Sequence, residues 1–318
     1  MYSNFPFGFN GGLSVRDIPI SPEHPRKVYW VGNNSALMTE EQAASNNNRG
    51  GFLDPVSTLD YAVGLCSPGD IIYVRPGYAQ SMTAADAVDI DVAGVTVIGL
   101  GRGTTRPKFT YDNSAGEFVI GAANVRIENL WFVPSVTGIT KAIDVETGST
   151  GFQIINCRFG DAETAGTDEF NATIIIAATT TDGVISGNYI NMGEAGAVAG
   201  ITITGACHRT EISNNVIIGD YSTANINSIT TLQSDLLIVD NLLVNGVTSG
   251  LNTEPTIELL TGSSGVIARN YSACNLTTLA AHQVNDTAAN FQNYFTEDRG
   301  SGNTAAATAA SIVASADD

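Results

Sequence analysis

Charged residues are scarce in this chain, and positively charged residues are the scarcest. Only 14% of the 318 residues are Asp, Glu, Lys or Arg, compared with about 25% in an average domain. The 14 Lys and Arg residues stand against 32 Asp and Glu residues, which gives a net charge of −18. This charge disfavours nucleic acid, an anionic membrane surface and an acidic polysaccharide as partners, unless a local basic groove or bound cations reverse it.

The sequence also lacks the patterns of a metal, redox or membrane protein. Its four cysteines are dispersed without a C-x-x-C pair, which favours buried thiols in a protein made in a reducing compartment. No apolar run approaches the roughly 18 residues of a membrane span. The N-terminus has no basic region followed by an apolar one, so we expect no secretory signal. We also expect no cofactor and no metal.

Motifs that carry catalysis are equally scarce. The histidines His24, His208 and His282 have no partner at the spacing of a nucleophile or a metal ligand. The segment GLGRG at 99–103 follows a predicted strand but leads into no helix. It therefore does not fit a phosphate-binding loop.

What the sequence does contain is a repeat. The segments RTEISNNVIIGD (209–220) and DLLIVDNLLVNG (235–246) share an isoleucine, an asparagine three residues later and a closing apolar pair. Successive anchor isoleucines are 27, 31, 27, 26 and 29 residues apart, and weaker copies lie near Ile72 and Val97. The anchors are Ile127, Ile154, Ile185, Ile212, Ile238 and Ile267.

A repeat of this length indicates a solenoid or another repeat array. Propeller blades need about 40–45 residues, and leucine-rich repeats need a leucine frame that this sequence lacks. Short segments rich in β-branched residues lie between the anchors, and no sustained helical period is present there. We therefore predict an all-β fold, a single-stranded right-handed parallel β-helix of about eight coils with about 28 residues each.

The asparagines of the repeat are predicted to be structural. Asn188, Asn215, Asn241 and Asn270 each follow their anchor by three residues. In stacked coils their amides lie on top of one another at one corner, and each donates to the next. Asparagine also tolerates the left-handed backbone conformation that a sharp bend between strands requires.

The chain is expected to divide into four segments. These are an extended docking arm (1–27), a capping unit with a short helix (28–69), the parallel β-helix (70–276) and a terminating segment with a low-complexity tail (277–318). The arm carries Phe5, Phe7 and Phe9 without a core of its own. We expect it to bury these side chains against a partner.

The helix of the capping unit is expected within the segment DPVSTLDYAVGLC. Asp54 or Ser57 is the expected N-cap. A helix there covers the open end of the solenoid, which a repeat protein needs for solubility. Its inward face is expected to contain Leu59, Ala62 and Val63.

Acidic side chains are the weak candidates for catalysis, because polysaccharide cleavage uses paired carboxylates, or calcium with a basic residue. Asp144 and Glu146 alternate with apolar residues and so point outward from a predicted strand, whereas Asp161 and Glu163 lie in a polar loop. A solubilising role is the simpler interpretation of both pairs. Basic residues on the coils come singly, and some are expected to form weak surface ion pairs; they are Arg126, Arg158, Arg209 and Arg269.

The segments KVYWVGNN, DPVSTLDYAVGLCSPGDIIYVRPGYAQ and VAGVTVIGLGRGTTRPKF, followed by the asparagine-bearing coils, resemble pectate-lyase-like β-helix proteins. The chain looks most like the members of that family found in virions of tailed bacteriophages, whose opening arms are similar to FPFGFNGGLSVRDIPI. The resemblance implies a homotrimer that serves as a tailspike, a fibre or a capsid-surface decoration. The catalytic signatures of polygalacturonases (N-T-D, G-H-G, R-I-K) and of pectate lyases (R-x-P-x-x-R) are absent from the sequence.

We therefore expect a non-enzymatic protein of the virion surface, made in the host cytoplasm and not secreted. The first expectation is a capsid decoration or cement protein that docks through its termini on virion proteins such as the major capsid protein. The alternative is a tail spike or fibre that binds or depolymerises a host surface glycan. A third possibility is a receptor-binding module without catalysis. Nucleic acid and membrane are not expected as partners.

Overall fold

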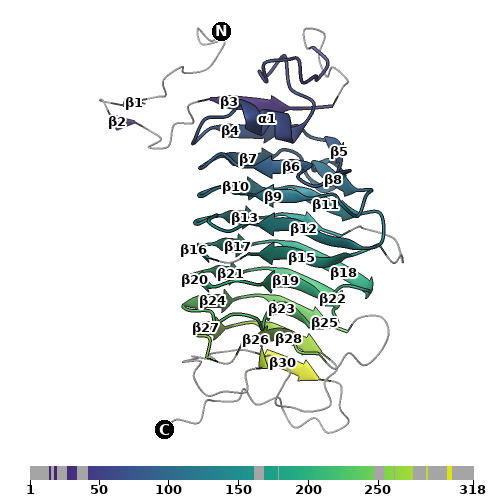
Figure 1. Cartoon of the computed structure of the whole chain (residues 1–318), viewed down its shortest axis with the longest axis vertical. Coiled ribbons are helices and arrows are strands. Elements are labelled where there is room, and N and C mark those ends of the chain that lie inside the picture. Colours follow the sequence, from purple (N-terminus) through teal and green to yellow (C-terminus); the bar gives the residue numbers. More distant parts are fainter. Residues whose placement is uncertain are drawn as a thin grey trace.

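The computed structural model describes residues 27–33, 42–160, 168–177, 179–246, 254–260 and 262–274, together with short strands at 14–15, 18–19, 284–285 and 299–302. Over these residues the chain is a right-handed parallel β-helix in which three sheets run along one axis (Figure 1). The predicted fold class is confirmed. No helix among the described residues is long and apolar enough to cross a membrane.

Each coil contributes one strand to each of the three sheets, and each strand pairs in parallel with its equivalent in the next coil. The first sheet contains β3(Val28–Val31), β4(Ile71–Val74), β7(Thr96–Gly99), β10(Arg126–Glu128), β13(Gln153–Ile155), β17(Val184–Ser186), β21(Glu211–Ser213), β24(Leu236–Val239) and β27(Gly265–Ala268). The second sheet contains β5(Ala79–Ser81), β8(Lys108–Tyr111), β11(Trp131–Pro134), β14(Arg158–Phe159), β18(Tyr189–Ala195), β22(Val216–Asp220), β25(Leu242–Asn245), β28(Tyr271–Cys274) and β30(Arg299–Gly302). The third sheet contains β6(Val88–Ile90), β9(Phe118–Ile120), β12(Ile139–Val145), β15(Phe170–Ile176), β19(Ala199–Ile203), β23(Ala224–Ser228), β26(Ile257–Leu259) and β29(Val284–Asn285).

Four short strands lie outside these sheets. Strands β16(Thr180–Thr181) and β20(Cys207–His208) form a parallel pair, and β1(Ser14–Val15) and β2(Ile18–Pro19) form an antiparallel pair. A 3-10 turn, η1(Gly103–Thr105), lies between β7 and β8.

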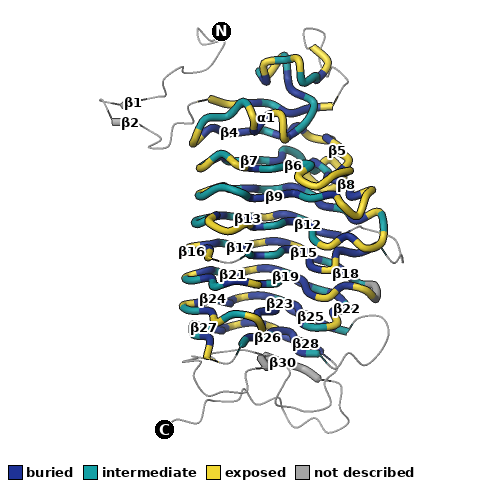
Figure 2. The backbone as a smooth tube through the Cα atoms, in the orientation of Figure 1, coloured by how far each residue is buried: buried dark blue, intermediate teal, exposed yellow. Residues whose placement is uncertain are grey.

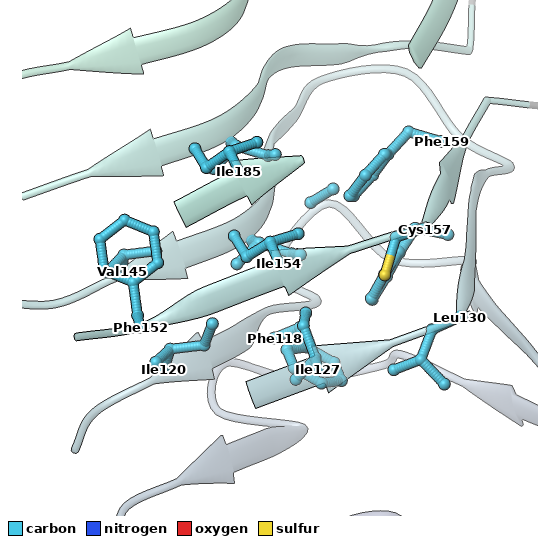
Figure 3. Close-up of a cluster of buried hydrophobic side chains, with 14 of the residues drawn as sticks. Phe118, Ile120, Ile127, Leu130, Val145, Phe152, Ile154, Cys157, Phe159 and Ile185 are labelled. Carbon is cyan, nitrogen blue, oxygen red and sulfur yellow. The ribbon is translucent and has the colours of Figure 1, made fainter. Parts of the chain in front are cut away.

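The anchor residues of the repeat stack on one another in the first sheet. The strand register aligns Val97 with Ile127, Ile127 with Ile154, and so on as far as Ile267. Each anchor is at most 1% exposed, and Figure 3 shows Ile127, Ile154 and Ile185 one above another. Burial of each such side chain contributes about 1.5–3 kcal/mol. The 26-to-31-residue spacing is thus the length of one coil.

Inward residues of the second sheet complete the core with an aromatic stack. The rings of Phe109, Phe132 and Phe159 lie on consecutive coils, with centroids 5.7 and 5.0 Å apart. Phe118 of the third sheet packs edge-on against Phe132 at 5.2 Å. In most strands of the first and second sheets, buried residues alternate with more exposed ones (Figure 2), so one set of side chains forms the core and the other set forms the outer faces.

Helix α1(Leu59–Leu65) lies beside β3 and β4 at one end of the solenoid (Figure 1). Its N-cap is Thr58, whose hydroxyl accepts from the Tyr61 amide at 3.4 Å. The expectation of Asp54 or Ser57 as the cap was wrong because the helix begins later, and the Ser57 hydroxyl instead donates to Asn46 Oδ1 at 2.9 Å. The buried residues of the helix are Leu59, Ala62 and Val63.

A single residue with positive φ makes the bend between the first and second sheets. It is Asn in three coils, Asn129, Asn156 and Asn214, with φ between 52° and 59°. The asparagines predicted to make this bend come one residue later: Asn214 has φ 55°, and Asn215 is not among the positive-φ residues. That part of the prediction was wrong, because the bend and the inward-pointing amide need different positions.

Candidate ligand-binding site

The four repeat asparagines form a continuous chain of hydrogen bonds just inside the bend. Asn188 Nδ2 donates to Asn215 Oδ1 at 3.0 Å, Asn215 Nδ2 to Asn241 Oδ1 at 3.0 Å, and Asn241 Nδ2 to Asn270 Oδ1 at 2.9 Å. Each amide also donates to a backbone carbonyl of the preceding coil at 2.8–2.9 Å. All four side chains are at most 2% exposed. This asparagine ladder holds the corner together and is inaccessible to a ligand.

The asparagine ladder ends at Cys157. The Cys157 amide donates to Asn188 Oδ1 at 2.8 Å, and the position before it in the stack is held by Leu130, which is fully buried. Burial raises the pKa of the Cys157 thiol to about 12. The thiol therefore stays protonated at neutral pH and serves as a packing residue.

Asp144, one of the carboxylates predicted as weak catalytic candidates, is held by a lysine. Asp144 points outward from β12, where it forms an ion pair with Lys141. Lys141 also lies 3.3 Å from Glu117. Burial opposes the charge of Lys141, but the hydrogen bonds and charges of Asp144 and Glu117 outweigh it and raise the lysine pKa. Asp161 and Glu163 lie outside the described residues.

Glu146 is brought close to a carboxylate that sequence reasoning missed, Asp89. A Cβ atom placed on Gly121 would lie 3.0 Å from Asp89 Oδ1 and 3.7 Å from Glu146 Oε2. Burial raises the pKa of Asp89, and the charges of Asp91, Glu146, Asp86 and Asp60 raise it further. We call these five carboxylates the acidic patch. No group of three or more His, Cys, Asp or Glu in the described residues could hold a metal ion.

Cationic and aromatic side chains alternate on the outer face of the second sheet. The register places Lys108, Trp131, Arg158 and Tyr189 on consecutive coils. The Arg158 guanidinium lies over the Trp131 ring at 4.9 Å and over the Tyr189 ring at 5.7 Å, and Lys108 Nζ lies 5.9 Å from the Trp131 ring. The Trp131 indole N–H donates to the Gly160 carbonyl at 2.7 Å, which fixes the ring. We call these four residues the cation–aromatic column.

A pocket of about 530 Å³ opens beside this column, at the corner where the first sheet bends into the second. Tyr189 belongs to both features. Glycine keeps the pocket open: Gly187 has φ +70°, and a Cβ atom there would lie 2.4 Å from Asn156 Oδ1. The lining residues are Ile98, Gly99, Gly101, Arg102, Arg106, Glu128, Asn129, Asn156, Cys157, Gly187 and Tyr189.

The loop 99–107, which follows β7, supplies the arginines of the pocket. Asn129 Nδ2 holds the loop by donating to the carbonyls of Gly99 and Gly101 at 2.7 and 3.1 Å. The Arg102 amide donates to Thr105 Oγ1 at 3.0 Å and closes the 3-10 turn. Arg102 and Arg106 are therefore presented from a backbone that is anchored to the next coil.

The basic residues around the pocket differ from the others on the coils in lacking an acidic partner. Within the described part of the chain, Arg102, Arg106, Lys108 and Arg158 form no ion pair. Elsewhere, arginines pair with carboxylates at 2.6–2.8 Å, in the pairs Arg126–Glu128, Arg209–Asp182 and Arg269–Asp240. The pocket is thus a local cationic region in a chain whose net charge is −18.

One signal in the sequence locates the cation–aromatic column, although the isoleucine–asparagine repeat does not include it. Trp131, Arg158 and Tyr189 each come four residues after their anchor isoleucine. That position comes directly after the position of the repeat asparagine, which Leu130 and Cys157 occupy in two of these coils. It faces outward at the start of each second-sheet strand. The pocket arginines have no such signal, because the loop 99–107 belongs to no repeat position.

Comparison with known proteins finds solved structures of low sequence identity. No protein family and no curated protein matches the sequence. Among solved structures, a rhamnogalacturonan lyase is 12% identical with a TM-score of 0.42, covering 84% of this chain and 87% of that one. Pectate lyase Pel9A is 10% identical with a TM-score of 0.43, covering 89% of this chain and 78% of that one. A GH136 lacto-N-biosidase from Eubacterium ramulus is 10% identical with a TM-score of 0.38, covering 86% of this chain and 67% of that one.

Proposed function

We propose that this chain is a glycan-binding β-helix that holds a polysaccharide against the second sheet without cleaving it. The observation that carries the proposal is the convergence of the cation–aromatic column and the pocket on one corner. Aromatic rings combine an apolar body with a fixed orientation, and guanidinium groups supply several hydrogen-bond donors. Consecutive coils repeat these groups about every 4.8 Å, which suits a regular polymer better than a compact ligand.

The chemistry of the pocket favours binding over cleavage. Glycoside hydrolysis uses two carboxyl groups on opposite sides of the scissile bond. Of the residues that line the pocket, Glu128 is the one carboxylate, and Arg126 holds it in an ion pair at 2.8 Å. The acidic patch, which contains Asp89 and Glu146, lies on the third sheet and not at this corner.

The biological setting is proposed from the sequence resemblance alone. We propose a protein of a phage virion surface, and a glycan-binding face favours the spike or fibre role over the capsid-decoration role that stood first among the expectations. Phe5, Phe7 and Phe9 of the docking arm lie outside the described residues. The homotrimer and the contact with other virion proteins remain predictions from the resemblance.

Binding to a panel of immobilised bacterial polysaccharides tests the proposal. We expect the wild-type protein to bind at least one of them, and Tyr189→Ala to bind it at least ten-fold more weakly, since a central aromatic side chain commonly carries more than about 1 kcal/mol of an interface. Tyr61→Ala is the matched control, because Tyr61 is 37% exposed on α1 and Tyr189 is 39% exposed at the pocket.

Three results would contradict this proposal. The first is equal binding by the Tyr189→Ala and Tyr61→Ala variants, which would place the glycan elsewhere. The second is release of new reducing ends or of an unsaturated product during incubation with the bound polysaccharide, which would make the chain an enzyme. Absence of binding across a panel that includes capsular, teichoic and lipopolysaccharide glycans would also reject it.

A further inference from the structure

Three guanidinium groups from two different coils gather at the pocket. Arg102 and Arg106 line it from the loop 99–107, and Arg158 stands beside it on β14, above the Tyr189 ring. The Nε atoms of Arg106 and Arg158 are both buried and have no hydrogen-bond partner. Burial lowers the pKa of Arg106; the nearby Cys157 opposes this shift, and the charge of Arg158 adds to it. Two cationic side chains, each with a buried Nε–H that has no hydrogen-bond partner among the described residues, thus lie close together.

Such an arrangement is costly unless an anion completes it. A buried donor without a partner forfeits its solvation, and the cost is larger when the group is charged. The chain contains 32 acidic residues and uses them to pair Arg209 and Arg269 elsewhere on the coils. At the pocket, the one acidic lining residue is Glu128, which is already paired with Arg126. No described acidic residue pairs with Arg106 or Arg158, so an anionic partner would come from outside the described residues.

The position of Arg158 shows how an anion would be held. Its two faces lie over the rings of Trp131 and Tyr189, so the stacking leaves the edge of the guanidinium to donate in its own plane. An edge of this kind matches an oxyanion through paired hydrogen bonds. Asn156, exposed on the pocket wall, adds a side-chain amide.

We propose that the pocket is a subsite for an oxyanion carried by the glycan, a carboxylate, sulfate or phosphate group on an acidic sugar, seated between Arg102, Arg106 and Arg158. This inference rests on the proposed glycan binding and narrows its ligand to acidic polysaccharides. It also explains how a chain of net charge −18 binds a polymer of the same sign, because the local field of the pocket opposes the field of the whole molecule.

Paired oligosaccharides that differ only in charge test the inference. The probes are a glucuronate-containing oligosaccharide and its carboxyl-reduced counterpart, measured by isothermal titration calorimetry at low and at high salt. We expect the acidic form to bind at least ten-fold more tightly than the reduced form, and its advantage to shrink as salt rises because screening weakens charge pairing. Arg106→Gln and Arg158→Gln should each abolish most of that advantage. Arg209→Gln, at a paired and distant arginine, should not.

Inorganic sulfate provides a readout that does not depend on glycan binding. We expect sulfate to raise the melting temperature of the wild-type protein more than that of Arg106→Gln or of Arg102→Gln, the latter being an exposed substitution that leaves the core intact. Equal stabilisation of all variants means an adventitious ion only and overturns the inference. Equal affinity for the acidic and reduced oligosaccharides also overturns it while leaving glycan binding in place. Variant-sensitive sulfate binding without binding of any glycan supports the anion subsite and rejects the proposed function.

Discussion

Single arginines on the coils have different surroundings even though the sequence presents them alike. Arg209 and Arg269 each lie against an aspartate of the preceding coil, at 2.7 and 2.6 Å. Arg158 instead stacks between two aromatic rings and forms no ion pair within the described residues. The sequence predicts weak surface pairs for some of them, and Arg126, Arg209 and Arg269 form such pairs. Arg158 differs because the residues above and below it, one coil away in each direction, are Trp131 and Tyr189.

The acidic patch gives a prediction for one residue. The folded-state pKa of Asp89 is raised, so the folded protein binds this proton more tightly than the unfolded chain does. Stability from this group is then fully present below the unfolded pKa and decreases as pH rises through the folded pKa. Asp89→Asn removes the unfavourable charge. We expect it to raise the melting temperature at pH 7 by about 1–2 °C, a small value because the site is largely solvent-screened.

Thermal unfolding at a series of pH values checks this prediction. The advantage of Asp89→Asn over wild type should disappear at low pH, where the wild-type carboxyl is protonated as well. Asp112→Asn, at an exposed position after β8, controls for the loss of one negative charge from a chain of net charge −18. A melting temperature for Asp89→Asn at or below that of Asp112→Asn at pH 7 would show that the patch is not a source of strain.

At the scale of the elements, the corner between the first and second sheets combines three layers. The bending residue has positive φ, the next residue points inward as Asn, Cys or Leu, and the one after it points outward into the second sheet. Each layer repeats once per coil, so one substitution disturbs its neighbours above and below. The asparagine ladder is the layer in which this dependence is strongest.

Replacing one ladder residue should destabilise the fold markedly. Asn215→Ala leaves Asn188 Nδ2 and the Ile185 carbonyl without the partners that they have at 3.0 and 2.8 Å. Unsatisfied buried polar groups cost about 1–3 kcal/mol each, so we expect a loss of about 2–5 kcal/mol in the free energy of unfolding. Chemical denaturation measures it, with Asn47→Ala, an exposed asparagine, as the control. Equal stability of the two variants would mean that the ladder contributes nothing.

Much of this architecture follows from the sequence. Because one coil takes 26–31 residues, each anchor pairs with the anchor of the following coil. The anchors from Ile127 to Ile267 therefore predict the register of the first sheet. The N-cap at Thr58 did not follow, since Ser57 and Asp54 satisfy the same preference and only the packing of the helix decides between them. The pocket did not follow either, because it needs the loop 99–107 and a Tyr side chain three coils further on to be brought to one corner.

At the scale of the whole molecule, the parallel β-helix is modular. Each coil contacts the coil before it and the coil after it, so stability is approximately a sum of nearest-neighbour terms. The register equates Ile212 with Ile238 and Val216 with Leu242. A chain that loses one whole coil can therefore close the gap with equivalent residues and keep its core continuous.

Deletion of residues 212–237 tests this modularity. The deletion brings Ile238 onto Ile185 and Asn241 onto Asn188, so that the core and the asparagine ladder both continue. We expect a folded β-protein with a single cooperative unfolding transition and an unchanged pocket, since the coils that line the pocket are retained. Deletion of residues 212–224, about half a coil, brings unlike positions together and should prevent folding. Circular dichroism and thermal unfolding distinguish the two, and equal failure of both deletions would contradict the modular picture.

The outward position of the second sheet has one further consequence. Lys108, Trp131, Arg158 and Tyr189 occupy it near α1, whereas Val216, Leu242 and Tyr271 occupy it toward the other end. Between Lys108 and Tyr271, a polymer that lies along this line meets the cations in the first part of its path and apolar side chains in the second part, after which the register places Arg299 beside Tyr271. The two orientations of a sugar chain, with its reducing end toward α1 or away from it, are therefore unequal in energy. The outer face of the second sheet therefore favours one orientation of a bound sugar chain over the other.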